Sequence, residues 1–363
     1  MYIEKLTLKN YRNYKFSQFE FVNGINILVG DNAQGKTNSA EAIFYICTGY
    51  SPKATRDKQL IRCGEKSFQI TGKAVSRYGD VEVDVTYEEG KNKVIKINEV
   101  PVKKIGELMG NINSVFFNPS ELKLIQQSPE DRRRFMDIAI SQMSKTYFYA
   151  LQKYRKILEQ RNNLLKNPDR EVIYETLPLW DEQLSIYAEI IINERIEFIK
   201  LLQPYAKEIH KFISDGKEDL ELSCDLSYAQ GDCGVKDTLK NALSERIEKD
   251  IVLGYTSVGP HRDDIKIKLN GEDVRIYGSQ GQQRTVALSL KLSELEIFND
   301  KFNEYPILIL DDALSELDKN RRVKLLERLK DIQTIITCTE ITEELSCYEN
   351  VKIFNISNGE ITK

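Results

Sequence analysis

A glycine-rich stretch near the N-terminus combines residue types that could bind phosphate groups. It fits the pattern G-x-x-x-x-G-K-[ST] over Gly30, Asp31, Asn32, Ala33, Gln34, Gly35, Lys36 and Thr37, and Asn38 follows it. Glycine allows dihedrals that turn successive N–H groups toward one point, where a helix start adds its positive dipole end. In such a loop the lysine reaches the β- and γ-phosphates, and the threonine hydroxyl ligates Mg²⁺. The stretch therefore predicts a site for ATP and Mg²⁺, with Lys36 as a catalytic cation and Thr37 as a metal ligand.

The segments on either side of this loop supply the context that such a site needs. Residues 25–29 are apolar and β-branched, which predicts a buried strand, and residues 38–47 have apolar side chains at helical spacing. A strand, a glycine turn and a helix in this order are typical of a phosphate-binding loop. A chance glycine turn would explain the letters of the pattern but not the flanking elements.

Two adjacent carboxylates end a second apolar run, over residues 306–312. A buried parallel strand delivers its C-terminal residues to the edge of the sheet where ligands bind. There Asp311 would hold Mg²⁺ through water, and Asp312 would take a proton from the attacking water as a general base. The alternative is that both acids only cap the next element.

A third stretch, Ser279, Gln280 and Gly281, opens a predicted helix over residues 285–299. Serine and glycine at a helix start expose N–H groups and form a second anion-binding nest. We therefore include these three residues in the predicted nucleotide site. An ordinary capped helix is the alternative.

The elements that must position these residues follow from hydrophobic periodicity. Residues 1–30 alternate like strands, three alternating runs between residues 68 and 98 predict an antiparallel meander, and residues 112–117 predict another strand. The period is helical from residue 120 to about residue 250. These elements predict an α/β fold with a mostly helical insertion.

Turn residues and prolines refine this prediction. Asn270-Gly271 predicts a hairpin between strands over 265–269 and 274–277. Pro168, Pro178, Pro204 and Gly216 interrupt the helical part, which argues for short helices and against a long coiled coil.

Charge is distributed unevenly, although the formal net charge is only −4. Residues 121–166 hold ten Lys/Arg against five Asp/Glu, a balance of +5, whereas residues 167–250 hold ten against nineteen, a balance of −9. A basic helical part with interleaved tyrosines is typical of a surface that binds nucleic acid. The candidates for contacts with DNA phosphates are Arg132, Arg133, Lys145, Lys153, Arg155 and Lys156. A solvated helix face is the alternative.

Composition narrows the class of protein. No stretch has the length of an apolar membrane span, and the N-terminus has no signal-peptide pattern. Six cysteines without a C-x-x-C pair, together with two histidines, indicate free thiols rather than a zinc site. We therefore expect a cytoplasmic protein.

The order of the motifs resembles the head of the ABC/SMC/Rad50 class of ATPases. Three further stretches resemble the RecF family of bacterial DNA replication and repair proteins: L-K-N-Y-R-N-Y at residues 8–14, S-P-E-D-R-R-R-F at 128–135 and V-G-P-H-R-D-D at 258–264. The resemblance extends over nearly the whole chain. It implies an ABC-type ATPase lobe from residues 1–106 and 256–363 and a helical lobe from residues 107–255.

The resemblance also implies a function. It implies that Arg12 and Asn13 contact the nucleotide, and that Ser279 and Gly281 contact the γ-phosphate held by a second copy of the chain. Such an ATP-driven dimer would hold double-stranded DNA near single-strand gaps and, with RecR and RecO, promote loading of RecA. Its ATPase activity would be weak and stimulated by DNA.

The chain departs from the family pattern after the first helix. The family has an arginine-rich G-R-S-x-R-T stretch there, whereas this chain reads G-Y-S-P-K-A-T over residues 49–55. Lys53 or Arg56 would have to supply the missing charge. The roles of His261 and Arg262 stay open between the nucleotide site and a structural brace.

Two other functions share the phosphate-binding motifs. One is the nucleotide-binding subunit of an ABC transporter, which would normally carry a histidine after the strand that ends near Thr339. The other is a DNA-binding module that senses ATP without turnover. ATP hydrolysis measured with and without duplex DNA separates the three.

Overall fold

The computed structural model describes residues 1–228, 234–346 and 350–362. Cys233 and Cys347, two of the expected free thiols, lie outside these ranges. The chain divides into two compact units. Unit 1 comprises Met1–Glu121, Ile209–Gly216 and Ala287–Lys363, and unit 2 comprises Leu122–Glu208 and Lys217–Val286.

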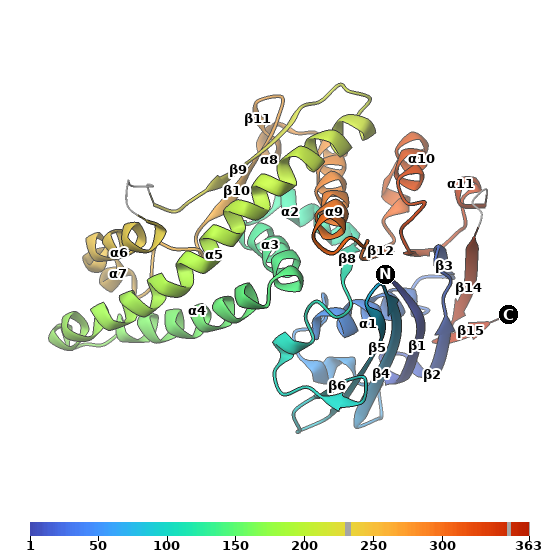
Figure 1. The fold of residues 1–363 in the computed structure, drawn as a ribbon, viewed down its shortest axis with the longest axis horizontal. Helices are drawn as coiled ribbons and strands as arrows, with labels where there is room; N and C mark the ends of the chain where they lie inside the picture. The colour runs from blue at the N-terminus through green and yellow to red at the C-terminus, as the bar shows by residue number, and fades with distance from the viewer. Residues whose placement is uncertain (229–233, 347–349, 363) are drawn as a thin grey trace. The chain divides into compact units, whose positions relative to one another are not determined.

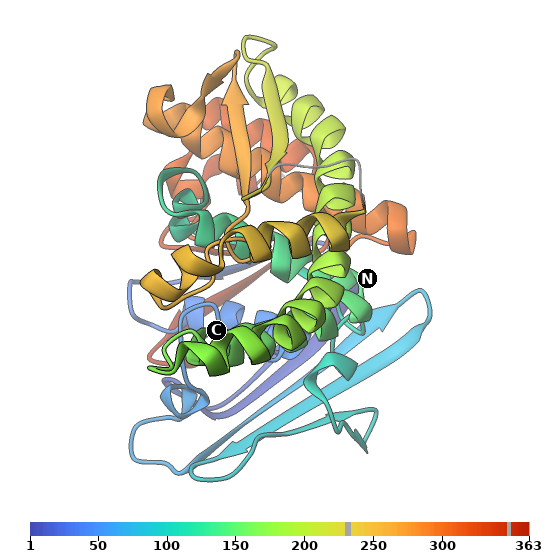
Figure 2. The same ribbon diagram turned by 90° about the vertical axis from the view of Figure 1, so that its left-hand side faces the viewer.

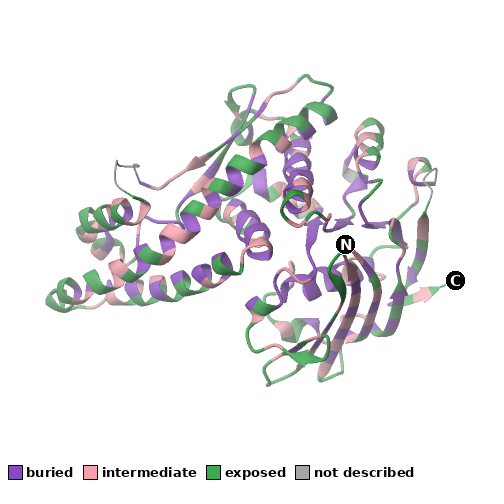
Figure 3. Cartoon of the chain, viewed as in Figure 1, coloured by how far each residue is buried: buried purple, intermediate pink, exposed green. Residues whose placement is uncertain are grey.

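Unit 1 contains a mostly parallel sheet with the strand order β15-β14-β3-β13-β12-β8 (Figure 1). Five strands are parallel, and β15 (Glu360–Thr362) is antiparallel to its neighbour β14. The parallel strands are β14 (Val351–Ser357), β3 (Ile25–Val29), β13 (Thr334–Cys338), β12 (Ile307–Asp311) and β8 (Ser114–Phe117). All residues of β12 and β13 are buried (Figure 3), as expected for strands covered on both faces.

A second, antiparallel sheet of unit 1 has the strand order β2-β1-β4-β5-β6-β7. Its strands are β1 (Tyr2–Tyr11), β2 (Tyr14–Glu20), β4 (Ser67–Ser76), β5 (Gly79–Glu88), β6 (Val94–Ile97) and β7 (Val100–Pro101). Helix α1 (Lys36–Thr48) contacts strands of both sheets and is buried along most of its length. The predicted strands over residues 1–30, 68–98 and 112–117 are confirmed, and α1 is fixed from both sides where it leaves the glycine-rich loop.

The remaining helical segments of unit 1 are short, apart from the part of α9 (Gln280–Phe302) that begins at Ala287. They are α10 (Lys319–Glu327), α11 (Glu343–Ser346) and the 3₁₀ turns η1 (Asp57–Leu60), η2 (Ile105–Glu107), η3 (Pro119–Leu122) and η4 (Leu314–Glu316). Helix α10 begins after Asp318, because the Asp318 side chain accepts a hydrogen bond from the Arg321 N–H at 3.0 Å. Among the described residues, every helix is too short or too polar to cross a bilayer.

Unit 2 is mostly helical, as expected. Its helices are α2 (Lys123–Gln126), α3 (Pro129–Met143), α4 (Lys145–Leu164), α6 (Val235–Glu245), α7 (Ile247–Leu253) and α8 (Val274–Tyr277), together with α5 (Arg170–Ile213) up to residue 208 and the first turns of α9. Helices α4 and α5 run antiparallel. Two contacts show this: Arg161 Nε lies 2.6 Å from Asp181 Oδ1 near the end of α4, and Tyr147 OH lies 3.0 Å from Arg195 Nε near its start.

The expectation of short helices is wrong for α5, which has 44 residues and contains Pro178 and Pro204. Each proline removes one helical hydrogen bond. Apolar residues on both sides of Pro178 are buried nonetheless, among them Leu177 and Leu184. Burial of this continuous apolar face stabilises the helix more than the proline weakens it.

A small sheet of order β11-β10-β9 completes unit 2, and Figure 2 shows it beside the C-terminal half of α5. Strand β9 (Leu220–Asp225) lies where helix was predicted. Its alternating Leu220 and Leu222 are buried, and the backbone of both bonds to the Gln203 side chain of α5. The predicted turn is confirmed between β10 (Asp264–Leu269) and β11 (Glu272–Asp273), with Asn270 and Gly271 at φ of 52° and 85°. The predicted second strand is wrong, because Asp273 caps helix α8 there.

The boundaries of the two units differ from those predicted at residues 107 and 255. Residues 107–121 remain in unit 1 because β8 pairs with β12 in the parallel sheet. Residues 256–286 belong to unit 2 because β10 pairs with β9 over six residues. Strand pairing, which one sequence does not reveal, therefore sets both boundaries.

Candidate nucleotide-binding site

The glycine-rich loop follows β3 directly and leads into α1. Ala33 and Gly35 have φ of 66° and 119°, a left-handed region that turns the backbone N–H groups of a loop toward a common centre. A Cβ atom at Gly35 would lie 2.6 Å from Asn13 Nδ2, so only glycine fits. Residues 31–38 line a hollow of about 110 Å³ with Asp312 and Thr337. This arrangement can bind phosphate oxygens.

The turn between β1 and β2 supports the loop from one side. Asn13 Nδ2 donates to the Gln34 carbonyl at 2.7 Å, and Asn13 Oδ1 accepts from Asn38 Nδ2 at 2.8 Å. The Tyr14 hydroxyl donates to the Gly35 carbonyl at 3.0 Å. Asn13 therefore holds the loop and the first turn of α1 together.

The turn between β14 and β15 supports the same loop from the other side. The backbone N–H of Asn358 donates to Gln34 Oε1 at 2.6 Å, and that of Gly359 donates to the Gln34 carbonyl at 2.9 Å. A Cβ at Gly30 would lie 2.2 Å from the Ile356 carbonyl oxygen. The loop therefore depends on residues from both ends of the described chain.

Lys36 is buried at the start of α1 and points its ammonium group back along the loop. Nζ donates to the carbonyl of Gly30 and, at 2.9 Å, to that of Asp31. These contacts hold the cation at the mouth of the loop, where a polyphosphate would replace the carbonyls as its partner.

Asp311, at the end of β12, is 2% exposed and lies against Thr37. Its Oδ1 accepts hydrogen bonds from the hydroxyls of Thr37 at 2.6 Å and Thr337 at 2.8 Å. A threonine hydroxyl beside a carboxylate offers the oxygen ligands that Mg²⁺ prefers, so Thr37 and Asp311 fit a metal ion.

Asp312 follows immediately but lies in a different environment. Its φ of 53° is left-handed, and its N–H donates to the Thr337 hydroxyl at 3.0 Å. This turn leaves Asp311 buried and places the exposed Asp312 on the hollow beside the glycine-rich loop. Two neighbouring carboxylates thereby become available for different roles.

Arg12 pairs with helix α1. Its Nε lies 3.1 Å from Glu41 Oε2, and its Nη2 lies 3.0 Å from Oε1 of the same, fully buried carboxylate. Nη1 also donates to the Gln59 carbonyl at 3.1 Å. A nucleotide contact by Arg12, as predicted, would have to form beside these bonds or replace them. Asn13, in contrast, contacts the loop directly.

Lys53 reaches the metal-binding pair. Its Nζ lies 3.2 Å from Asp311 Oδ2. Arg56 instead begins the short turn η1, where its N–H donates to Gln59 Oε1 at 3.3 Å. Of the two candidates for the missing arginine, Lys53 is therefore the one that the structure brings to Asp311.

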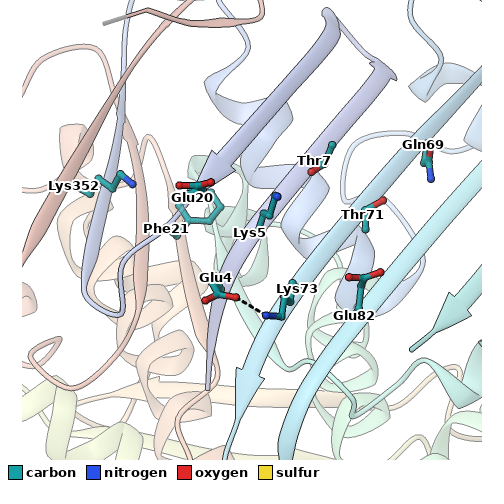
Figure 4. Close-up of a pocket in the computed structure, with 10 residues that line it drawn as sticks. All are labelled: Glu4, Lys5, Thr7, Glu20, Phe21, Gln69, Thr71, Lys73, Glu82 and Lys352. Atoms are coloured by element: carbon teal, nitrogen blue, oxygen red, sulfur yellow. Dashed lines mark ion pairs between the residues drawn. The ribbon is translucent and has the colours of Figure 1, made fainter. Parts of the chain in front are cut away.

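A larger hollow, about 880 Å³, lies on the outer face of the antiparallel sheet. Its side chains include Lys5, Lys73 and Lys352 and an equal number of glutamates, and Glu4 pairs with Lys73 at 2.9 Å (Figure 4). Because these charges balance and no glycine-rich loop faces it, this hollow lacks the features of a phosphate site.

Ser279, Gln280 and Gly281 lie at the start of α9 in unit 2. The Ser279 N–H donates to Gln282 Oε1 at 2.8 Å, and the Gln282 N–H donates to Ser279 Oγ at 3.3 Å. This reciprocal pair is a capping box. Ser279 and Gln280 are exposed, beside the exposed Ile276 and Tyr277, so the helix start is accessible from solvent.

The six predicted DNA-contacting residues differ in accessibility. Arg132 is 4% exposed and makes a bidentate pair with Asp264 at 2.6 and 2.7 Å, so it is not available for DNA. Arg133 is half-buried and donates to the Asp263 carbonyl at 2.8 Å. Arg155 pairs with Asp137 at 3.1 Å, although two thirds of its side chain is exposed. Lys145, Lys153 and Lys156 are exposed on α4.

His261 makes its contacts inside unit 2. Nε2 lies 3.0 Å from the Thr256 carbonyl, which can only accept, so Nε2 carries the hydrogen in the neutral ring. Nδ1 then accepts from the Tyr154 hydroxyl at 2.6 Å. Arg262 lies over the Tyr255 ring at 4.7 Å. Both residues brace unit 2 in this structure.

This geometry makes the stability of unit 2 depend on pH. Burial lowers the pKa of His261 from its ordinary 6.5 to about 4. The neutral ring therefore contributes stability that is complete above pH 6.5 and is lost as the pH falls toward 4. We expect the free energy of unfolding to fall more steeply for the wild type than for His261→Gln, by about 1.4 kcal/mol per pH unit at most.

Urea unfolding followed by the fluorescence of Trp180, the only tryptophan and a residue of α5, measures this difference at pH 7 and pH 5. Parallel pH profiles of the two proteins would contradict the assignment.

Sequence reasoning missed several residues that shape the site. Thr337 lies on the strand predicted to end near Thr339 but was not placed in the site, although the end of a parallel strand beside β12 and β3 is a signal for it. The turn at Asn358 and Gly359 has the residue types of a tight turn, but nothing nearby in sequence links it to the loop. Glu41 gave no signal, because a single glutamate in a helix is ordinarily solvated.

The fold and the site together define a P-loop ATPase head of the ABC/SMC type. The family model for the RecF/RecN/SMC N-terminal domain matches residues 2–362, so the chain belongs to this family. Among solved structures, the Smc head domain of Pyrococcus furiosus shares the fold, with a TM-score of 0.58 at 18% identity over 99% of this chain and 95% of that one. The expected fold class is confirmed.

The similarity is higher to proteins named RecF. The DNA replication and repair protein RecF of Clostridium perfringens is 44% identical over 99% of each chain, and that of Clostridium beijerinckii is 43% identical over 99% of this chain and 98% of the relative. A solved structure named as the recombination mediator protein RecF-ATPrS in the RecFOR pathway has a TM-score of 0.92 at 36% identity, covering 100% of this chain and 98% of that one. The resemblance to RecF is confirmed.

Proposed function

We propose that this chain is an ATP-dependent DNA-binding protein of recombinational DNA repair and replication restart. One observation carries the nucleotide part: the Thr37 hydroxyl at the end of the phosphate loop lies 2.6 Å from the buried Asp311, with Asp312 exposed on the same hollow. A phosphate loop, a metal-binding pair and a second carboxylate are what hydrolysis of a Mg²⁺-bound triphosphate requires. The solved RecF relative named with ATP supports the same ligand.

In this proposal each side chain has its own role. Lys36 holds the β- and γ-phosphates, Thr37 and Asp311 hold Mg²⁺, and Asp312 takes the proton of the attacking water. The metal would neutralise charge that develops on the phosphate oxygens. Hydrolysis is slow and stimulated by DNA. ATP therefore mainly switches the chain between its states and does not supply energy for continuous work.

The proposed partners rest on the resemblance to RecF and on the exposed start of α9. ATP joins two copies of the chain, with the γ-phosphate between the phosphate loop of one copy and Ser279–Gln280–Gly281 of the other. The dimer clamps double-stranded DNA near single-strand gaps and, with RecR and RecO, promotes RecA loading. It acts in the cytoplasm, where the DNA that its relatives replicate and repair is located.

We place the DNA contact on an α4 stripe formed by Lys145, Lys153 and Lys156. All three are exposed, and their spacing of eight and three residues puts them on one side of the helix. Arg132 is excluded by its buried pair with Asp264. Such lysines bind phosphates and do not read base sequence.

Changing these three lysines to glutamate should weaken binding to all duplexes alike. Each lost phosphate contact reduces the slope of log affinity against log salt by about 0.9, so loss of three reduces it by about 2.7. Fluorescence anisotropy of labelled duplexes at several salt concentrations measures the slope.

The matched control changes Lys200, Lys217 and Lys249, three exposed lysines elsewhere in unit 2, to glutamate. This control changes the net charge by the same amount as the α4 variant. It should keep most of the wild-type slope of log affinity against log salt. If both triple variants lose the same slope, only the overall charge matters and the α4 stripe is not the contact.

Measuring ATP turnover with and without duplex DNA tests the proposed function. We expect slow hydrolysis that DNA accelerates in the wild type and loss of ATP binding in Lys36→Ala. Binding without turnover would instead indicate an ATP sensor. An ATP turnover rate that does not change when duplex DNA is added would contradict the link between hydrolysis and a DNA clamp.

A further inference from the structure

Lys53 places a positive charge on the carboxylate that is proposed to hold the metal ion. Its Nζ lies 3.2 Å from Asp311 Oδ2, while Oδ1 of that carboxylate accepts bonds from Thr37 and Thr337. The Asp311 side chain is only 3% exposed, so its negative charge has to be balanced within the protein. Lys53 supplies that balance, and both Asp311 oxygens have partners in this structure.

The backbone that carries Lys53 is fixed. The Ser51 hydroxyl oxygen accepts the N–H groups of Lys53 at 3.0 Å and Ala54 at 2.6 Å. The same hydroxyl donates to the fully buried Glu41, whose carboxylate is held by Arg12. This chain of bonds connects the loop after α1 to the turn that supports the phosphate loop.

The Lys53 side chain, in contrast, is 45% exposed. A lysine has a flexible four-carbon stem, so its ammonium group can leave Asp311 while the backbone stays in place. A metal ion on Thr37 and Asp311 would lie within a few ångströms of this ammonium group. Two positive charges at that distance repel each other, so Lys53 and a divalent cation compete for one carboxylate.

We propose that Lys53 is an internal counter-cation of Asp311 that keeps divalent metal out of the nucleotide-free site and yields the carboxylate when metal arrives together with nucleotide. The inference rests on the proposed function of Thr37 and Asp311 as metal ligands. It gives Lys53 a positioning role: it sets the order in which metal and nucleotide bind, and its released ammonium group becomes available to phosphate oxygens.

Titration of the nucleotide-free chain with Mn²⁺ alone, followed by the electron paramagnetic resonance of the free ion, tests the competition. Lys53→Met keeps the length of the side chain and removes the charge. We expect this variant to bind Mn²⁺ about tenfold or more tightly than the wild type, because the competing cation is gone. Lys53→Gln should show the same gain, and adding Asp311→Asn to Lys53→Met should abolish it.

Lys58→Met is the matched control, because Lys58 lies five residues away and pairs with Glu89 instead. It should bind Mn²⁺ like the wild type. Equal affinity in the wild type, Lys53→Met and Lys53→Gln would overturn the proposal, as would an equal gain in Lys58→Met.

Calorimetry with ATP in the presence of Mg²⁺, on the same samples, separates this outcome from the proposed function. A wild type that does not bind ATP under these conditions would contradict the nucleotide site. The Mn²⁺ comparison contains no nucleotide and would still decide the role of Lys53.

Discussion

Asp312→Asn is expected to bind ATP like the wild type and to hydrolyse it about 10²–10⁴-fold more slowly, the usual cost of losing a general base. The amide has nearly the shape of the carboxylate but cannot accept the proton of the attacking water. The backbone bond from the Asp312 N–H to Thr337 does not involve the altered group, so the left-handed turn should persist. Single-turnover hydrolysis and ATP titration on the same sample measure both quantities.

Asp31→Asn is the matched control for this change. Asp31 is also exposed, lines the same hollow and carries the same charge. It is, however, the second residue of the phosphate loop, whereas Asp312 follows β12. Its turnover should stay within a few-fold of the wild type. Equal losses in the two variants would show that local charge, and not a base at Asp312, controls the rate.

Ser279→Arg is expected to abolish ATP-driven dimerisation while each monomer still binds ATP. The substitution puts bulk and a positive charge at the helix start that is proposed to face Lys36 and the γ-phosphate of a second copy. The γ-phosphate is the group that ADP lacks, so the wild type should dimerise with a non-hydrolysable ATP analogue and not with ADP. Light scattering measures the mass of each species.

Ser244→Arg, an exposed serine of α6 in the same unit, provides the control and should dimerise normally. Loss of the Ser279 cap should itself cost about 1 kcal/mol, and a urea unfolding curve accounts for it. Dimers of Ser279→Arg, or a wild type that dimerises equally with ADP, would contradict the arrangement.

Features encoded by neighbouring residues could be predicted from the sequence. The phosphate loop, the acid pair at Asp311 and the capped start of α9 each lie within one short stretch, where residue type and spacing determine local geometry. Strand alternation likewise identified the meander β4-β5-β6 of the antiparallel sheet, and continuous apolar runs identified β3 and β12 of the parallel sheet. The proline argument failed in α5 because burial along the whole helix outweighed a local penalty.

Contacts between distant residues account for what was missed. Arg132 and Arg161 count as basic surface in the sequence, yet Arg132 pairs with Asp264 across 132 positions and Arg161 pairs with Asp250 across 89. The contact of Lys53 with Asp311 spans 258 positions. A composition count has no information on which face of a helix is buried, so it cannot separate a buried ion pair from a DNA-binding lysine.

The support of the phosphate loop by the turn at Asn358 and Gly359 has a consequence for synthesis. The bond from Asn358 to Gln34 joins residues 324 positions apart. At about 5–20 residues per second, a ribosome needs on the order of half a minute to add that length. During this time the growing chain has its phosphate-binding residues but lacks one side of their support. We therefore expect nucleotide to assist the final folding of unit 1, after the turn at Asn358 and Gly359 has joined the loop, and not the folding that precedes it.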